Sequence, residues 1–222
     1  EVHYDKWVRK CYDEFRGSFK AESNTTSYQL CDILSEVLTP DDVIVVGCST
    51  MFVSIFSAFF RNKEGQRIIP SSTGLGTMGA SIPVAIGVAL ASGKRVICID
   101  GEGSFMQNIQ ELEVVRRLNL NIIFFVINNG GYASIRNSED RAFGRHEEGM
   151  TFPYICEIAE SFGIRTDRFD NLEFAKWDYI NDWVTPAVIE IITPHNEILA
   201  PRVNAMDVGG GLGNMWPYKE KK

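Results

Sequence analysis

Two glycine-containing stretches place polar side chains directly after apolar runs. In IDGEGSF (residues 99–105), a single carboxylate, that of Glu102, stands between two glycines. The second stretch, VINNGGY (residues 126–132), contains Asn128 and Asn129, and Asn129 follows Glu102 by 27 residues. Neighbouring parallel strands end at the same edge of a sheet, so a carboxylate, an amide oxygen and a glycine carbonyl should meet there. Oxygen ligands of this kind suit Mg²⁺, with phosphate oxygens completing its octahedron.

The residues around Glu102 suit the binding of phosphate. Gly101 and Gly103 have no side chain, so the backbone can approach a ligand closely. Gly103 and Ser104 would offer N–H and hydroxyl donors at the start of the following helix, where anions are favoured. Either stretch alone is also explained by an ordinary solvated turn. The pairing of the two stretches is what favours a ligand site.

The elements that must hold these stretches alternate along the chain. Apolar, β-branched runs without polar alternation predict strands buried on both faces, at residues 43–47, 67–71, 95–100, 121–128 and 187–193. Thr26 and Gln29 form a capping-box pattern before a first helix. Further helices are predicted at residues 50–60, 79–91, 107–118, 154–162 and 173–182. This alternation predicts an α/β fold with three layers: a doubly wound, mainly parallel sheet with helices on both faces.

Composition narrows the class of protein. The 222 residues are 45% hydrophobic and 23% charged, which suits one large globular domain. The net charge of −7 argues against a nucleic-acid partner, because phosphate backbones require basic surface. No apolar stretch approaches the roughly 20 residues of a membrane span, and no signal peptide is recognisable, so we expect no membrane partner. The five cysteines match no zinc pattern, which indicates small hydrophobic residues in a reducing cytoplasm.

A dinucleotide site is an alternative interpretation. Gly74, Gly76 and Gly79 match the GxGxxG fingerprint, and Asp100 lies where the ribose-binding acid belongs. That fingerprint normally follows the first strand of its fold, whereas here two predicted elements precede it. An oxidoreductase of this kind would also leave the pairing of the two glycine-containing stretches unexplained.

The two stretches together resemble a known motif. GEGS followed by NN is similar to the GDG…NN motif of thiamine-diphosphate-dependent enzymes. The surrounding segments TGLGTMGASIPVAIGVALA, NIIFFVINNGGYASIRNSEDRAFGR and PHNEILAPRV resemble the acetolactate-synthase-like branch of that family. The similarity extends over most of residues 25–203. It implies a C-terminal, diphosphate-binding domain with thiamine diphosphate and Mg²⁺ as cofactors.

The resemblance also implies roles for individual residues. The Glu102 carboxylate, the Asn129 side chain and the Gly131 carbonyl would hold Mg²⁺ against the diphosphate. The Gly76 carbonyl would bind the aminopyrimidine, and Met78 would enforce a bent cofactor, which brings reacting groups together; simple core packing is the alternative for Met78. Further cofactor contacts are assigned to Gly47, Cys48, Ser49, Thr50, Gly101, Gly103, Ser104 and Tyr132.

Glu102 departs from the family pattern, which usually has aspartate at this position. The longer side chain moves the carboxylate by roughly one C–C bond, and Mg²⁺ tolerates distorted geometry poorly. We expect a working site. The alternative is a degenerate, non-catalytic module of the same fold that serves in assembly or regulation.

The resemblance divides the chain into three parts. Residues 1–24 would be a helical lead-in that follows a middle domain, residues 25–203 the diphosphate-binding domain and residues 204–222 a glycine-rich tail. The chain thus resembles the C-terminal third of a longer enzyme or, alternatively, a naturally split subunit. His146 could line a channel beyond the metal loop, or could be an ordinary exposed histidine.

The implied reaction is decarboxylation of a 2-oxo acid with formation or cleavage of a C–C bond. The glutamate that activates the cofactor belongs to a pyrimidine-binding domain for which this chain has no room. We therefore expect that domain as a partner, from the same enzyme or another subunit, within a homodimer or homotetramer. The isolated chain should be inactive, and its apolar partner face should make it self-associate.

Overall fold

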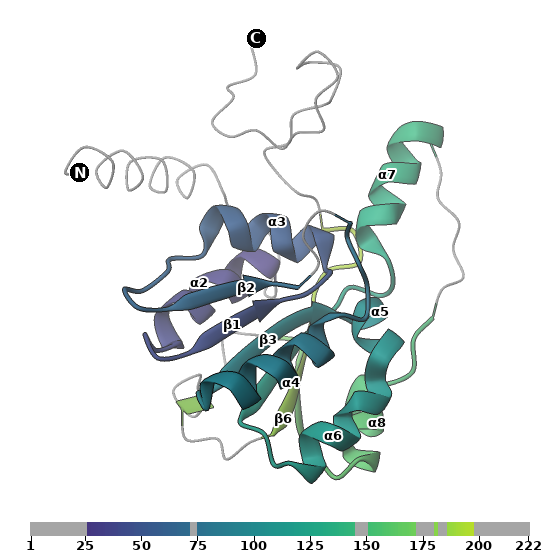
Figure 1. Ribbon diagram of the computed structural model, residues 1–222. Coiled ribbons are helices and arrows are strands. Elements are labelled where there is room, and N and C mark those ends of the chain that lie inside the picture. The colour runs from purple at the N-terminus through teal and green to yellow at the C-terminus, as the bar shows by residue number, and fades with distance from the viewer. Residues whose placement is uncertain (1–25, 72–74, 145–150, 172–179, 182–185, 198–222) are drawn as a thin grey trace, which may run out of the picture. The chain divides into compact units, whose positions relative to one another are not determined.

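Six strands form one sheet in the order β2-β1-β3-β4-β6-β5, and every neighbouring pair is parallel (Figure 1). The computed structural model describes residues 26–71, 75–144, 151–171, 180–181 and 186–197. The strands are β1 (Val43–Val46), β2 (Arg67–Pro70), β3 (Val96–Gly101), β4 (Ile122–Asn128), β5 (Arg165–Phe169) and β6 (Ala187–Ile192).

Helices cover both faces of this sheet. Figure 1 shows α4 and α6 in front of the strands and α2 behind them. The helices are α2 (Ser27–Val37), α3 (Thr50–Phe59), α4 (Ser81–Ser92), α5 (Glu102–Phe105), the 3₁₀ helix η1 (Met106–Glu111), α6 (Leu112–Arg117), α7 (Ala133–Phe143) and α8 (Ile155–Ser161). The predicted three-layer, doubly wound parallel fold is confirmed. The capping box at α2 is also present, with both of its Thr26–Gln29 hydrogen bonds.

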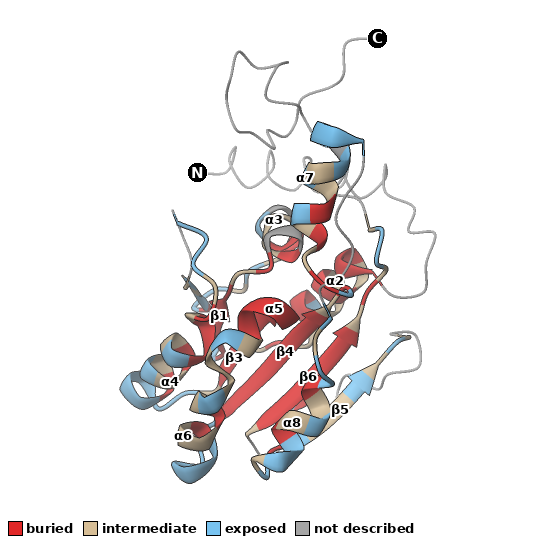
Figure 2. Ribbon diagram, turned by 90° about the vertical axis from the view of Figure 1, so that its right-hand side faces the viewer, coloured by how far each residue is buried: buried red, intermediate tan, exposed pale blue. Residues whose placement is uncertain are grey.

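The central strands are buried on both faces because helices pack against each (Figure 2). On one face, Phe124 and its neighbours pack against apolar residues of α4, α5, α6 and α8. The ring of Phe105 meets that of Phe124 edge-on, with centroids 5.5 Å apart. Ile123 and Phe125, whose side chains lie on the other face of the sheet, are also fully buried. The sheet is therefore the centre of the hydrophobic core.

The sequence-based element predictions are wrong for two elements and miss two others. Strand β2 is an exposed edge strand rather than a strand buried on both faces, and Ile68 is 40% exposed. The predicted helix 107–118 is broken, because Asn108 has non-helical backbone angles, and η1 and α6 meet end to end instead. Strand β5 and helix α7 were not predicted at all. The predicted helix 173–182 lies mostly outside the described residues.

Several further predictions concern parts of the chain beyond this description. The proposed lead-in (1–24) and tail (204–222) lie outside the described residues, so the three-part division stays a prediction.

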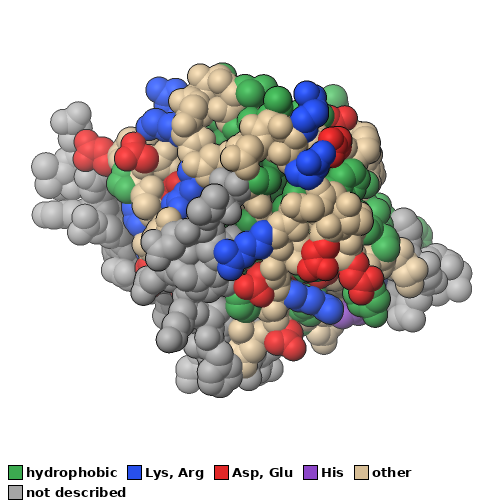
Figure 3. Space-filling view, turned by 90° about the horizontal axis from the view of Figure 1, so that it is seen from below, with side chains coloured by type: hydrophobic (Ala, Val, Ile, Leu, Met, Phe, Trp, Pro, Cys, Tyr) green, Lys and Arg blue, Asp and Glu red, His purple; other side chains and the backbone are tan. Residues whose placement is uncertain are grey.

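Among the described helices, none has the length and apolarity needed to cross a membrane. On the face seen in Figure 3, the described Lys and Arg side chains are interspersed with Asp and Glu.

Candidate functional site

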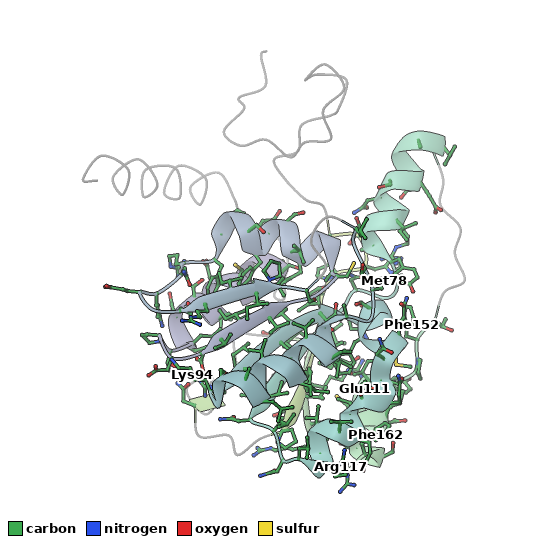
Figure 4. The ribbon with its side chains drawn as sticks, in the orientation of Figure 1. Met78, Lys94, Glu111, Arg117, Phe152 and Phe162 are labelled. Atoms are coloured by element: carbon green, nitrogen blue, oxygen red, sulfur yellow. The ribbon has the colours of Figure 1, made fainter. Side chains whose placement is uncertain are left out.

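A cavity of about 220 Å³ lies at the carboxyl ends of the central strands, where open parallel sheets bind their ligands. Figure 4 shows Met78 and Phe152 at this end of the sheet and Lys94 at the other. The cavity is lined by Cys48, Ser49, Gly76, Met78, Gly101, Glu102, Gly103, Ser104, Asn129, Gly131, Tyr132, Ala133, Ser134 and Ile135.

The register of two neighbouring strands brings the two glycine-containing stretches together. Strands β3 and β4 stay paired until Gly101 lies opposite Ile127. Glu102 then leaves β3 as the first residue of α5, while β4 ends at Asn128 and turns through Asn129. Both stretches therefore leave the sheet at the same edge, as the sequence predicted.

Glu102 is held by the backbone of the turn that follows β4. Its side chain is 2% exposed, and Oε1 accepts hydrogen bonds from the N–H groups of Asn129 (3.1 Å) and Gly131 (2.7 Å). Burial raises the pKa of Glu102 to about 7, against the lowering effect of these bonds and of the nearby charge of Arg136. The carboxyl group is thus fixed at the floor of the cavity.

The same turn offers further oxygen atoms. Among the described residues, the Asn129 side-chain oxygen accepts one long contact, of 3.4 Å, from the Ala133 N–H. Among the described residues, none donates a hydrogen bond to the Gly131 carbonyl, and Gly131 lines the cavity. One carboxylate, one amide oxygen and one carbonyl fit a hard cation such as Mg²⁺. The described residues contain no cluster of three or more His, Cys, Asp or Glu that could hold a metal. Mg²⁺ commonly completes its coordination with water and phosphate oxygens.

Asp100 fixes the ends of β1 and β3 beneath the cavity. Its Oδ1 accepts from the N–H groups of Cys48 (2.8 Å) and Gly101 (2.9 Å), and its Oδ2 accepts from the hydroxyls of Ser104 (2.8 Å) and Ser81. Burial raises the pKa of Asp100 to about 6. Because this carboxylate is 1% exposed and engaged at both oxygens, it is not placed to bind a ribose, which removes the main support for the dinucleotide alternative.

The glycines of the site allow close packing. A Cβ on Gly47 would lie 2.5 Å from the carboxylate of Asp100. A Cβ on Gly103 would lie 2.3 Å from the ring of Tyr132, which itself packs edge-on against Phe152 with centroids 5.5 Å apart. Any larger residue at either position would displace a neighbour that forms the site.

Two sulfur-containing side chains lie beside Gly76. The Cys48 thiol donates to the Gly76 carbonyl at 3.2 Å, and Gly76 has a positive φ of 62°. The Met78 sulfur accepts a contact of 3.7 Å from the Gln107 amide. The carbonyl predicted to bind the aminopyrimidine is therefore at the cavity, but it is occupied by a thiol from within the chain.

The structure brings most of the predicted site residues together. All of them line the cavity except Gly47, which lies against Asp100, and Thr50, whose side chain is outside the description. His146 also lies outside the described residues. Sequence reasoning missed Ala133, Ser134 and Ile135, the first turn of α7. Their position directly after NNGGY was the available signal, since a helix that starts there must border the site.

Comparison with known proteins agrees with this arrangement. The sequence model of the family described as "Thiamine pyrophosphate enzyme, C-terminal TPP binding domain" matches residues 45–190, about two thirds of the chain. The chain belongs to this family. Thiamine pyrophosphate is the same compound as thiamine diphosphate, so the predicted family and its main cofactor are confirmed.

Relatives place the chain near the acetolactate synthases. It is 30% identical to acetolactate synthase 1, chloroplastic, of Zea mays over 218 residues, covering 91% of this chain and 33% of that protein. It is 38% identical to the acetolactate synthase large subunit of Buchnera aphidicola (subspecies Acyrthosiphon pisum, strain APS) over 122 residues, covering 53% of this chain and 21% of that protein. The chain thus spans a third or less of the length of these curated relatives.

A solved structure shares the fold. The thiamine diphosphate-dependent 4-hydroxybenzoylformate decarboxylase of Rhodococcus jostii RHA1 superposes with a TM-score of 0.69 at 23% identity. The match covers 79% of this chain and 34% of that one. At this level of identity, the comparison supports the architecture alone.

Proposed function

We propose that the cavity binds thiamine diphosphate through Mg²⁺. The chain would then be the C-terminal part of an enzyme that decarboxylates a 2-oxo acid, with formation or cleavage of a C–C bond. The observation that carries the proposal is the convergence of the Glu102 carboxylate with the Asn129 amide and the Gly131 carbonyl, which accepts no hydrogen bond from a described residue, at the cavity. The bound cofactor would supply an electron sink for cleavage of a bond next to a carbonyl group.

The residues of the chain would bind and orient that cofactor. Glu102, Asn129 and Gly131 would hold Mg²⁺ against the diphosphate, and Gly103 would contact its phosphates. The Gly76 carbonyl would exchange its bond to the Cys48 thiol for one to the cofactor's amino group. The remaining predicted contacts, which would orient the cofactor or contact its phosphates, are Met78, Ser49, Thr50, Gly101, Ser104 and Tyr132.

We further propose that turnover requires a pyrimidine-binding domain, from the same enzyme or another subunit, in a homodimer or homotetramer. The chain's coverage of about a third of its relatives supports this, as do the strongly exposed side chains of Leu75 (91%) and Phe143 (76%). The isolated chain should show no decarboxylation. The described cysteines form no disulfide with one another, as is usual in the cytoplasm.

Calorimetric titration tests the binding proposal. Thiamine diphosphate would be titrated, with Mg²⁺ and with EDTA, into the wild-type chain, Glu102→Asp and Glu102→Gln. We expect Mg²⁺-dependent binding by the wild type and loss of it in Glu102→Gln, which keeps the size of the side chain but removes the charged ligand. No binding by either carboxylate-bearing protein would refute the proposal for this chain.

A non-catalytic module is the second candidate function. Two observations favour it: the site has glutamate where the family has aspartate, and the Tyr132 ring covers Gly103. If only Glu102→Asp bound the cofactor, the site would have drifted from binding and this second function would be preferred.

A further inference from the structure

One buried arginine, Arg136 on α7, binds the carbonyl side of the turn that follows β4. Its guanidinium is directed back from the helix: one terminal nitrogen donates to the Gly130 carbonyl (3.1 Å), and the other donates to the carbonyls of Asn129 (2.9 Å) and His195 (2.9 Å). The residue is 8% exposed. We propose that Arg136 is a positioning residue for the cation site, which it shapes through the backbone of residues 129–131; the inference rests on the proposed function.

This turn needs such support because its glycines are conformationally free. Gly130 and Gly131 both have positive φ, at 71° and 125°. Glycine loses more backbone entropy on folding than any other residue, so two in succession leave a turn that must be held from outside. Glu102 holds it from one side by accepting two N–H groups, and Arg136 holds it from the other by donating to two carbonyls.

The distribution of these bonds determines which oxygen remains for a ligand. Arg136 engages the carbonyls of Asn129 and Gly130, whereas the Gly131 carbonyl accepts from no described residue and lines the cavity. A planar guanidinium presents its donors in a fixed fork, so it can fix two successive carbonyls in one orientation. An ammonium group is a single point of charge and cannot reproduce that geometry.

The charge of Arg136 should weaken cation binding, whereas its hydrogen bonds to the turn should strengthen it. A positive charge near Glu102 repels an incoming cation, so removing it alone would strengthen metal binding. Two substitutions separate the effects: Arg136→Lys keeps the charge and loses the fork, while Arg136→Gln removes the charge. Positioning predicts that both weaken the site. Electrostatics alone predicts that Arg136→Gln strengthens it.

The test uses the full 222-residue chain, with Asn137→Ala as the matched control. Asn137 is the next residue on α7, and its side chain donates to the Glu197 carbonyl at 3.3 Å, so it ties the same helix to the 195–197 turn. Two quantities would be measured: hydrogen exchange of the amides of Asn129 and Gly131 without any ligand, and the Mg²⁺ concentration for half-maximal binding of thiamine diphosphate.

We expect both Arg136 variants to exchange these two amides faster and to need roughly 10- to 100-fold more Mg²⁺, the effect usual for partners that orient metal ligands. Asn137→Ala should change neither quantity, and melting temperatures would show that the variants are folded. If Arg136→Gln does not fold, the same two quantities are compared between Arg136→Lys and the wild type.

Two results would overturn the inference: unchanged exchange in both Arg136 variants, or tighter Mg²⁺ binding by Arg136→Gln. A wild-type chain that binds no thiamine diphosphate would instead refute the proposed function. The exchange measurement, made without ligand, would still decide whether Arg136 positions the turn.

Discussion

Replacing Gly47 by alanine should strongly destabilise the protein, although the backbone conformation there does not exclude alanine. The new Cβ would lie 2.5 Å from Cγ and Oδ1 of Asp100 and 2.9 Å from Cβ of Ser81. Asp100 cannot easily move aside, because Oδ1 holds the N–H groups of Cys48 and Gly101 and the carboxylate is 1% exposed. Either the strand ends separate or these hydrogen bonds break.

The size of the effect follows from these contacts. Overpacking a well-filled site costs about 1–3 kcal/mol. A hydrogen bond to a charged group contributes about 1.5–3 kcal/mol, and at least one of the two on Oδ1 should be lost. Together these give a loss of about 3–5 kcal/mol in the free energy of unfolding. For a protein of this size, roughly 2–4 °C per kcal/mol, the melting temperature should fall by about 6–20 °C.

Gly87→Ala is the matched control for Gly47→Ala. Gly87 is an exposed residue inside α4, and a Cβ there would meet no atom within 4 Å. Alanine is favoured over glycine inside a helix by roughly 0.5–1 kcal/mol, so this variant should be slightly more stable. Both variants would be compared with the wild type by thermal and urea unfolding. A Gly47→Ala protein that unfolded at the same midpoint as the wild type would show that Asp100 is not held as described.

Two further predictions use titratable groups. Thiamine diphosphate with Mg²⁺ should slow alkylation of the cavity-lining Cys48, whereas Cys98 and Cys156 should stay unreactive at neutral pH because burial raises the pKa of both thiols, that of Cys156 to about 12; peptide mapping that showed unchanged labelling of Cys48 would contradict this. Burial also raises the pKa of Glu197 above 4.5, against the hydrogen bonds from Ser27, so the folded state loses stability as pH rises above that value. Glu197→Gln removes this loss, and the melting temperature of the variant minus that of the wild type should increase with pH; a constant difference would refute the assignment.

Much of the fold was predictable because local chemistry and the global structure agree. The buried strands β3 and β4 are apolar up to Ile99 and Ile127, since helices cover them on both sides. Edge strands are different: Ile68 and Ile69 of β2 resemble residues of a central strand, and Pro70, a residue found mainly on edge strands, was the available signal for exposure. The Asn108 break was not predictable either, because its amide donates to the carbonyl of the distant Gly79 at 2.7 Å.

Part of the candidate site was likewise predictable from the sequence, and part was not. The convergence of Glu102 and Asn129 followed from strand ends and spacing. The role of Asp100 could not be predicted, since its partners Cys48 and Ser81 lie on other elements, and the sequence pattern suggested a ribose contact instead. The bonds of Arg136 likewise depend on how α7 leaves the turn, and α7 itself has a predominantly polar sequence that was not predicted as a helix.

The position of β6 has a consequence for biosynthesis. It is the last of the described strands along the chain, yet it lies between β4 and β5 in the sheet. It also completes the turn after β4: the Asn128 amide donates to the buried Glu190 of β6 at 2.6 Å, and the Thr193 N–H donates to the Asn128 carbonyl at 2.9 Å. During synthesis, β4 therefore remains an open edge until residues 187–192 have left the ribosome, and exposed edges invite wrong pairing. The turn that contains Asn129 and Gly131, two of the proposed cation ligands, is completed only when that strand joins the sheet, so the proposed site forms late in the synthesis of the chain.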